Sequence, residues 1–530
     1  YNRFIMLLTP KLKRLYSYAL LICLTLLGMA ALWRSTPYGL GLVNDSAYYI
    51  EGADNLLAGK GYVRTSGGGE VKPITHFPPF FSIMLAAFSL SGLELLPAAR
   101  LLVTLLFGLT ILLTGMSVQR ISRSPVFGLL GALLLASSDV FLGVFSMALS
   151  EPLFLALMLA AFLALANGLK RPSWGWLACA GVLLSLATLT RYAGASLYLV
   201  AILAVLLFQR VRAARPWKAL GWLLAGGLPL PLIWMLVSRL AGGGEAVGNR
   251  LVTWHPPEAR MLFEAAKNLL TWLAPDDLLA AAPIFGRLLS LASLLLLPGL
   301  LAWLVWRAWP RRASSPPPPA LAWSLALQVP VYLGFLVISL TLFDASTPLN
   351  ERILSPAYLA MLALFAGGLG WAWRWLVERK RRLRWAVAGV ALLAAAFSLV
   401  DGISAVRQLG SEGQGFAHSG WQQSPAIQAV RQLPPVTIYC NKATAIYLLT
   451  GRSAYVIPTP TDPVTGLERL EFAGDLEKMQ QRVLAGEAVM VLFGLRGSAD
   501  PEEAALYDTL SAGMPILADY GGDMLLGDLR

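Results

Sequence analysis

The sequence contains few cysteines, few histidines and few charged residues. Only 3 of its 530 residues are cysteines, and 3 are histidines. The cysteines, Cys23, Cys179 and Cys440, are isolated from one another, which excludes a disulfide framework and the spacing of a zinc site. Charged residues make up 14% of the chain, against about 25% in ordinary soluble proteins. The sequence is therefore not that of a soluble multidomain protein.

Hydrophobic residues, by contrast, make up 57% of the chain and are concentrated in long blocks. Each block has about 17–24 residues, which is enough helix to cross a hydrocarbon core of about 30 Å. The eleven blocks are Leu15–Trp33, 99–117, 126–145, 152–168, 173–190, 193–209, 219–238, 284–306, 320–343, 354–373 and 383–400. The sequence predicts a mainly α-helical, polytopic membrane protein with about 11 transmembrane helices.

The first block follows several basic residues, as the core of a signal peptide does. It is too long for such a core, and no small-residue cleavage site follows it. We therefore expect an uncleaved helix that starts in the cytoplasm. Because the chain opens with Tyr1 rather than Met, we expect its true start to be missing or processed.

The loops between the blocks differ in charge. Five short loops hold 17 Lys or Arg residues, at 120–123, 170–171, 210–218, 307–312 and 374–384. These loops lie on the same side as the basic N-terminus only if residues 77–92 do not cross the membrane. Cytoplasmic loops are enriched in Lys and Arg, so we interpret 77–92 as a juxtamembrane or re-entrant helix on the outer face. The C-terminal region is then outside as well.

We expect two domains. Residues 1–402 form a transmembrane domain with two long outer loops, 35–98 and 239–283, and the second loop has amphipathic character at Pro257–Leu273. Residues 403–530 hold nine basic and 14 acidic residues, so the excess that gives the chain its net charge of +12 lies in the membrane part. Because the basic residues occupy short loops, they indicate cytoplasmic retention rather than binding of nucleic acid.

The C-terminal region alternates between short strands and helices. The predicted strands are Val436–Cys440, Ala454–Ile457, Ala488–Leu492 and Ile516–Tyr520, and the predicted helices are Lys442–Leu449, Leu476–Ala485 and Pro501–Ser511. Such alternation predicts a small, soluble, extracytoplasmic α/β domain.

Two acidic residues lie on the predicted outer face. Asp45 follows the first block by about twelve residues, and Glu151 begins the fourth block beside Pro152. Two carboxylates that face one cavity can hold a divalent cation or divide the roles of base and stabiliser. Alternatively, Asp45 is a solvated loop residue and Glu151 only a favourable first-turn residue of its helix.

Two arginines and three further polar residues occur on the same predicted outer face. Arg191 stands between two blocks, and Arg352 opens a later one. A guanidinium at the membrane surface suits a phosphate group because it donates bidentate hydrogen bonds; the alternative is an arginine that snorkels to the interface. Glu351 is then an ion-pair partner of Arg352. Lys72 and His76 are either ligand contacts or interfacial anchors.

Several segments, in this order, resemble the GT-C glycosyltransferases. They are Asn44–Tyr62 with Pro78–Phe80 of the first outer loop, Ala148–Leu153 of the second-loop acid motif, Thr190–Gly194, Arg352–Pro356, and Ile446–Arg452 of the outer domain. The branch that they resemble is the bacterial one related to protein O-mannosyltransferases and lipid A aminoarabinose transferase. The resemblance covers the whole chain, although many relatives have Arg-Tyr where this chain has Arg352-Ile353.

The resemblance implies a GT-C fold in the bacterial cytoplasmic (inner) membrane and an inverting glycosyltransferase. Its donor is a polyprenyl-phosphate sugar that enters laterally from the bilayer, and its acceptor is a lipid, a glycan or a protein. The acid that matches Asp45 serves as base or helps to bind a metal, and the acid that matches Glu151 assists. No second acid flanks Asp45, so a divalent cation is left open as a cofactor. Arg191 or Arg352 would neutralise the leaving phosphate.

Two other classes of protein compete with this interpretation. A transporter would place ionisable residues near mid-membrane and broken helices at matching positions in two halves, whereas here the ionisable residues cluster at one face. A catalytically inactive subunit of a larger membrane complex would retain Asp45 and Glu151, so the sequence leaves this class open. A stable partner that co-purifies with the chain would favour it.

Overall fold

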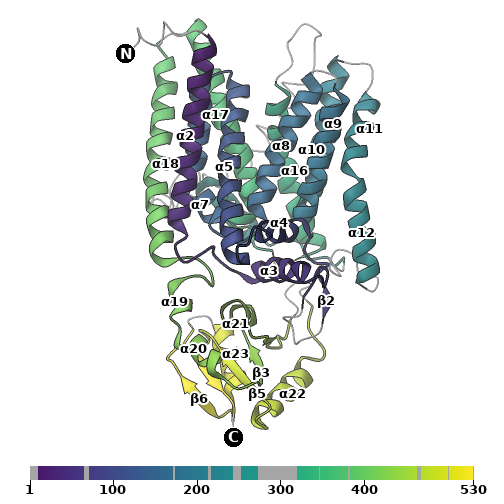
Figure 1. Ribbon diagram of the computed structural model, residues 1–530, viewed down its shortest axis with the longest axis vertical. Coiled ribbons are helices and arrows are strands. Elements are labelled where there is room, and N and C mark those ends of the chain that lie inside the picture. The colour runs from purple at the N-terminus through teal and green to yellow at the C-terminus, as the bar shows by residue number, and fades with distance from the viewer. Residues whose placement is uncertain are drawn as a thin grey trace.

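The protein is a long helical bundle with a smaller α/β domain at one end (Figure 1). The computed structural model describes residues 10–64, 71–170, 173–212, 216–242, 252–271, 319–344, 347–379, 382–461, 467–498 and 501–528. The predicted mainly α-helical fold with a small C-terminal sheet is confirmed.

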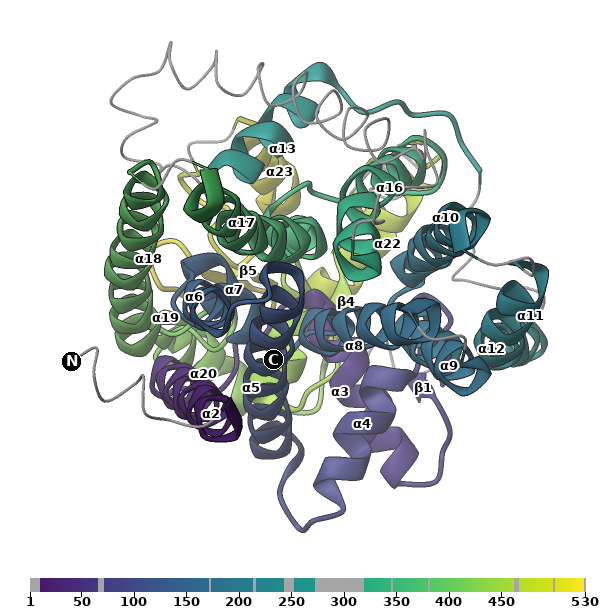
Figure 2. The ribbon, with the colours of Figure 1, turned by 90° about the horizontal axis from the view of Figure 1, so that it is seen from above.

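Six helices among the described residues are long and apolar enough to cross a membrane. They are α2 (Pro10–Ser35), α5 (Leu95–Ser122), α8 (Glu151–Lys170), α16 (Ala320–Leu342), α17 (Glu351–Arg379) and α18 (Arg384–Glu412). Helix α5 contacts α2, α8 and α17, and the view along the bundle shows α2 and α18 on one side of it and α8 and α16 on the other (Figure 2). A helix suits these segments because all of its backbone hydrogen bonds are internal.

Two of the predicted spans are each broken into two helices. The block at 126–145 forms α6 (Pro125–Ala136) and α7 (Asp139–Phe145), which meet at 59°. The break occurs where Ser138 adopts an extended conformation and its hydroxyl caps the Phe141 amide of α7. The span at 126–145 stays a prediction. The block at 219–238 forms α11 (Pro216–Gly227) and α12 (Pro229–Ala241), bent by 41° where Pro229 lacks an amide donor.

Shorter apolar helices complete the bundle. Helix α9 (Trp174–Thr190) is followed by a 3-10 turn, η1 (Tyr192–Gly194), and by α10 (Ala195–Arg212). Helix α9 packs closely on α11, since a Cβ added to Gly226 would lie 2.3 Å from the Ala178 carbonyl oxygen. The predicted block 284–306 lies outside the described residues, so the count of about 11 transmembrane helices stays a prediction.

Two helices lie across the end of the bundle that faces the α/β domain (Figure 1): α3 (Asn44–Leu57) and α4 (Phe80–Ser89). A short hairpin of β1 (Val63–Arg64) and β2 (Lys72–Pro73) lies between them in sequence. Helix α4 has 10 residues, about 15 Å of helix and half of a hydrocarbon core. This length fits the interpretation of 77–92 as a segment that does not cross the membrane.

The second predicted outer loop contributes one described helix. Helix α13 (Ala259–Thr271) coincides with the predicted amphipathic segment and packs on α17. The residues that precede it run along the end of α16, where the His255 amide donates to the Thr341 carbonyl at 3.0 Å.

The C-terminal domain has one mixed sheet with helices on both faces. Its elements are α19 (Ser419–Gln422), α20 (Pro425–Gln432), β3 (Thr437–Cys440), α21 (Ala443–Thr450), β4 (Tyr455–Val456), α22 (Phe472–Leu484), β5 (Ala488–Leu492), α23 (Pro501–Ser511), β6 (Ile516–Asp519) and β7 (Met524–Leu526). The strand order is β4-β3-β5-β7-β6, with β3 parallel to β4 and β5 and the other pairs antiparallel. One apolar core packs α20 and α21 on the sheet, and a second packs α22 and α23.

The four strands predicted from the sequence coincide with β3, β4, β5 and β6, whereas β7 was missed. Helix α18 runs through the predicted domain boundary at 402/403 and ends at Glu412. The division into residues 1–402 and 403–530 stays a prediction.

Candidate active site

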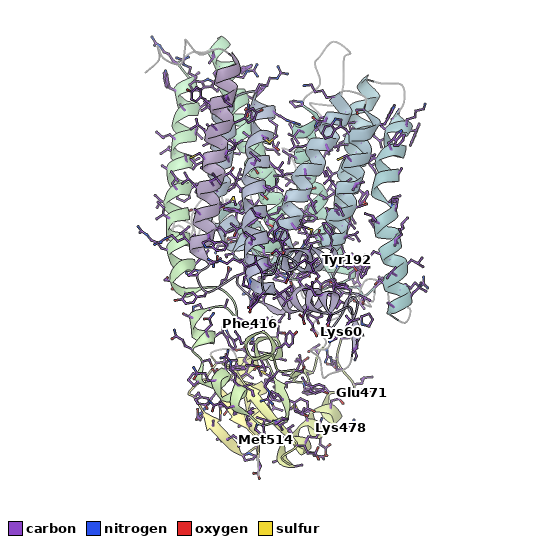
Figure 3. The ribbon with its side chains drawn as sticks, viewed as in Figure 1. Lys60, Tyr192, Phe416, Glu471, Lys478 and Met514 are labelled. Atoms are coloured by element: carbon purple, nitrogen blue, oxygen red, sulfur yellow. The ribbon has the colours of Figure 1, made fainter. Side chains whose placement is uncertain are left out.

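A cavity of about 440 Å³ lies at the end of the bundle that faces the C-terminal domain. Its wall is built from the start of α3, residues 76–78, residues 191–193, the second half of α16, Asp344, residues 347–348 and the start of α17. Tyr192, which belongs to this wall, lies beside α3 and α4 in Figure 3. The segments that carry Asp45, Arg191 and Arg352 therefore meet at this cavity, whereas Glu151 is not part of its wall.

Each of the four principal residues stands at a helix start or a helix break. Asp45 is in the first turn of α3, Glu151 is the first residue of α8, and Arg352 is the second residue of α17. Acids are favourable in a first turn because the helix N-terminus carries partial positive charge. Arg191 has an extended backbone, with φ −148° and ψ 134°, and separates α9 from η1.

The four residues form one chain of ion pairs. Arg352 Nη2 donates to Asp45 Oδ2 at 2.7 Å, and Arg352 Nε lies 3.1 Å from Glu151 Oε1. Arg191 Nη1 lies 2.5 Å from the same Glu151 oxygen. Two guanidiniums and two carboxylates therefore balance in charge, and Glu151 stands between the arginines.

Glu151 is the most enclosed of the four residues. Its side chain is 2% exposed, against 17% for Arg191, 22% for Arg352 and 29% for Asp45. Both guanidiniums lie within ion-pair distance of Glu151. Neither carboxylate oxygen, however, accepts a hydrogen bond. The charge of Glu151 is thus neutralised, whereas its capacity to accept hydrogen bonds is unfilled.

Two hydroxyl groups hold Arg191 in place. Arg191 Nη1 also donates to Ser150 Oγ at 3.2 Å, and Tyr49 OH is hydrogen-bonded to the same hydroxyl at 2.9 Å. Burial raises the pKa of Tyr49, so its hydroxyl stays neutral. Burial acts to lower the pKa of Arg191, but Glu151, Tyr49, Tyr332 and Asp45 together outweigh it and hold that pKa above its ordinary value. Arg191 is a fixed cation.

Aromatic side chains support the cavity wall. Phe77 packs against Tyr49, with ring centroids 5.1 Å apart, and against His76 at 4.7 Å. Tyr192 OH donates to the Thr75 carbonyl at 2.8 Å and accepts a hydrogen bond from Trp234 Nε1 at 3.1 Å. These contacts hold the segment before α4 against η1 and α12.

The remaining predicted residues differ in their positions. His76 lines the cavity with Asp45, Arg191 and Arg352, whereas Lys72 and Glu351 are not part of its wall. Lys72 is exposed on the β1–β2 hairpin.

Sequence reasoning missed three polar residues of this site. Asp344 lines the cavity and is 8% exposed; it directly follows a predicted span on the outer face, so the criterion that selected Asp45 also applies to it. Ser150 adjoins Glu151 within the quoted acid motif. Tyr332, which donates to the Ile353 carbonyl at 2.7 Å and fixes the first turn of α17, lies inside an apolar helix and gives no signal.

The donor set for a divalent cation is poor. No group of three or more His, Cys, Asp or Glu residues that could hold a metal ion occurs within the described residues. Asp45 and Glu151 each lie against a guanidinium instead. The residues of this site therefore do not fit a metal ion, and arginine charge takes its place.

Residues 76–234 match the family model described as dolichyl-phosphate-mannose-protein mannosyltransferase. This match covers less than a third of the chain. No curated protein matched the sequence.

Solved structures match over almost the whole chain. One is ArnT from Cupriavidus metallidurans bound to undecaprenyl phosphate, with 14% identity, 95% of this chain and 97% of that chain covered, and a TM-score of 0.56. Another is the oligosaccharyltransferase AglB from Archaeoglobus fulgidus in complex with an inhibitory peptide and a dolichol-phosphate, with 12% identity, 97% and 74% covered, and a TM-score of 0.54. At these identities the likeness establishes the fold, which is that of the GT-C glycosyltransferases.

Proposed function

We propose that this chain is an inverting glycosyltransferase that moves a sugar from a polyprenyl-phosphate donor to an acceptor hydroxyl on the face of the C-terminal domain. The observation that carries the proposal is the pair of fixed guanidiniums, Arg191 and Arg352, beside Asp45 in one cavity. Two structures with the same fold contain a polyprenyl phosphate, undecaprenyl phosphate in ArnT and dolichol-phosphate in AglB, which supports a lipid phosphate as the ligand.

The donor phosphate would bind to the arginines. A phosphodiester carries one negative charge, and a guanidinium offers a planar fork of donors to its oxygens. Arg352 already contacts both acids, and Arg191 contacts Glu151. The phosphate therefore joins a charge network that the protein has assembled before the donor arrives, which is the arrangement that stabilises a leaving group without reorganisation.

Asp45 would take the proton of the acceptor. Of the two acids predicted from the sequence, Asp45 lines the cavity and is 29% exposed, so an acceptor can reach it. The acceptor oxygen attacks C1 of the sugar, and its proton passes to the Asp45 carboxylate. The bond from C1 to the phosphate oxygen breaks with its electron pair, and polyprenyl phosphate leaves with one further negative charge. Attack from the face opposite the phosphate inverts C1.

Glu151 would have another role. A side chain that is 2% exposed and lies between two guanidiniums is not placed to meet an acceptor. It would hold Arg191 and Arg352 at the spacing that the phosphate needs.

The proposed location is the bacterial cytoplasmic (inner) membrane, with the cavity and the C-terminal domain on the outer face. Helix α8 begins at the cavity and ends at Lys170, and near that far end Arg120 of α5 donates to Asn167 at 3.0 Å. These basic ends point away from the C-terminal domain, which agrees with retention of basic loops in the cytoplasm.

The test uses the purified full chain in lipid nanodiscs with a panel of polyprenyl-phosphate sugars and lipid, glycan and peptide acceptors. Asp45→Asn keeps the size of the side chain but cannot take a proton, so transfer should slow by about 10²–10⁴. Asp54→Asn is the matched control, because Asp54 lies on the same helix and is exposed outside the cavity. Its rate should match the wild type.

Two results would count against the proposal. A wild-type rate for Asp45→Asn, on a donor and acceptor that the native protein uses, would remove Asp45 as the base. A native protein that binds undecaprenyl phosphate but transfers no sugar of the panel, and that co-purifies with a fixed partner, would favour an inactive subunit of a larger complex.

A further inference from the structure

Three segments that are distant in sequence meet between the bundle and the C-terminal domain. They are residues 41–42 before α3, residues 146–148 before α8, and residues 414–416 after α18; we call them the three-segment junction. Gly41 pairs with Met147, and Leu42 pairs with Gly415, both in parallel bridges. Phe416 marks the junction in Figure 3, between the bundle and the α/β domain.

Backbone hydrogen bonds connect all three segments. The Gly41 amide donates to the Ser146 carbonyl at 2.7 Å, and the Ala148 amide donates to the Gly41 carbonyl at 2.9 Å. The Phe416 amide donates to the Leu42 carbonyl at 2.7 Å. A side-chain bond adds to these, because the Ser146 hydroxyl donates to Gln414 Oε1. Residues 414–416, which we call the connector because they lead from α18 to the C-terminal domain, are thus hydrogen-bonded to both of the other segments.

The junction stands directly before both acids of the candidate site. Asp45 follows Leu42 by three residues, and Glu151 follows Ala148 by three residues, a span of at most about 11 Å of chain. The residues between Leu42 and Asp45 are constrained as well, because the Val43 amide donates to Ser46 Oγ at 3.0 Å at the start of α3. A shift at the junction would therefore move the starts of α3 and α8.

Gly415 is required by the close approach of the chains. Its φ is +57°, in the left-handed region, and a Cβ built on it would lie 2.2 Å from the Leu42 carbonyl oxygen. Any other residue at this position would push the connector away from the segment that leads to Asp45.

The connector is also anchored in the C-terminal domain. Phe416 packs edge-on against Trp421 with ring centroids 5.3 Å apart, and Trp421 packs against Phe493 after β5 at 4.9 Å. Leu448 of α21 packs against the core of the bundle. The position of the C-terminal domain is therefore linked to the segments that carry the acids.

We propose that Gln414 and Gly415 are positioning residues, through which the C-terminal domain sets the positions of Asp45 and Glu151. The consequence for catalysis rests on the proposed function, but the mechanical link does not. Arg191 directly precedes η1, and Arg352 stands on α17; neither segment belongs to the junction. Loosening the junction should lower kcat by displacing the acids, and should raise the KM for the donor less, because the arginines are coupled to the junction only through those acids.

The first measurement is amide hydrogen exchange on the full chain in nanodiscs. Gln414→Ala removes one side-chain hydrogen bond and introduces no clash, so exchange at the amides of 41–46 and 146–151 should quicken by about fivefold. Gln480→Ala is the control: it likewise removes one glutamine side-chain hydrogen bond, the one that Gln480 Nε2 donates to the Thr509 carbonyl at 3.1 Å within the C-terminal domain. It should leave both segments unchanged.

The second measurement is sugar transfer by Gly415→Ala, compared with Gly451→Ala. Both glycines have positive φ, but a Cβ on Gly451 meets nothing within 4 Å, so only the first variant adds a clash. Gln414→Ala and Gly415→Ala should both lower kcat, about threefold and at least tenfold respectively, and in each variant the donor KM should rise by a smaller factor than kcat falls.

The outcomes separate the two proposals. Unchanged exchange in both Gln414→Ala and Gly415→Ala would overturn the mechanical link. Faster exchange with an unchanged kcat would overturn the role of Gln414 and Gly415 as positioning residues. If the native protein transfers no sugar, the proposed function fails, and faster exchange in 41–46 and 146–151 would still support the mechanical link.

Discussion

Replacing Glu151 with Gln should destabilise the protein and tighten its binding of a lipid phosphate. Glutamine keeps the size of the side chain but leaves two guanidiniums, 2.5 and 3.1 Å away, without the charge between them. Removing one partner of a buried ion pair costs about 3–5 kcal/mol. Because Arg352 retains Asp45 and both arginines are 17–22% exposed, we expect about 3 kcal/mol.

The affinity of the Glu151→Gln variant for the lipid phosphate should rise, although its stability falls. Without Glu151, one positive charge of the network is uncompensated, and an arriving phosphate supplies the missing negative charge. Unit charges 4 Å apart interact by about 4 kcal/mol at an effective dielectric constant of 20, and part of this is already screened by Asp45. A tenfold gain in affinity, about 1.4 kcal/mol, is a conservative expectation.

Thermal unfolding with and without undecaprenyl phosphate measures both effects. Glu151→Gln should melt below the wild type and should recover more on addition of the lipid. Glu264→Gln is the control, because the Arg260–Glu264 pair is exposed and such surface pairs contribute about 0.3–0.5 kcal/mol. If Glu151→Gln keeps both the native melting temperature and the native affinity, Glu151 does not hold the arginines. A weaker affinity would refute the charge argument itself.

Three further predictions concern the phosphate, the topology and the pH dependence. Arg352→Ala should weaken binding of undecaprenyl phosphate more than Arg352→Lys, which keeps the charge but loses the fork; equal, native affinities would leave Arg191 as the phosphate ligand. Protease added to spheroplasts should release a fragment of 403–530, and cleavage only in inverted vesicles would reverse the topology. Burial and, to a smaller extent, the negative charges of Glu51 and Asp54 raise the pKa of Tyr447 from about 10 to about 12. The folded protein then keeps this proton after the unfolded chain has lost it, so stability should fall between pH 10 and 12, and less steeply in Tyr447→Phe as followed by unfolding curves.

The sequence predicted the helices because the length of an apolar run limits what can cross a membrane. It did not predict the break between α6 and α7, since Ser137 and Ser138 lie within an apolar run, and only the structure shows that α6 ends at Ser137 and that the Ser138 hydroxyl caps α7. In the C-terminal domain, β3 and β5 were predicted as short strands that alternate with helices. Strand β7 has only three residues, too few for any pattern, and is recognisable only by its pairing with β5 and β6.

The residues of the candidate site were proposed from the sequence, but their contacts were not. Topology placed Asp45 and Glu151 on one face, and the arginines were selected for a phosphate. That Glu151 contacts both arginines is a tertiary fact, since α8, α9 and α17 must converge before their ends can pair. Tyr332 could not have been predicted as a site residue, because a tyrosine inside an apolar helix more often packs in the core than takes part in a functional site.

In the proposed reaction, the total charge of the cavity stays constant. Before transfer, Asp45 and the donor phosphodiester each carry one negative charge; afterwards Asp45 is protonated and the released phosphate carries two. One negative charge thus passes from Asp45 to the phosphate. Arg352 contacts the Asp45 carboxylate, which carries that charge before transfer. Since Nε of Arg352 stays against Glu151 while Nη2 faces Asp45, the same guanidinium can stabilise the charge before and after transfer without moving. A fixed cation of this kind lowers a barrier because no solvent or side chain must reorient as the charge moves. The fork of Arg352, rather than its charge alone, is then what the chemical step requires.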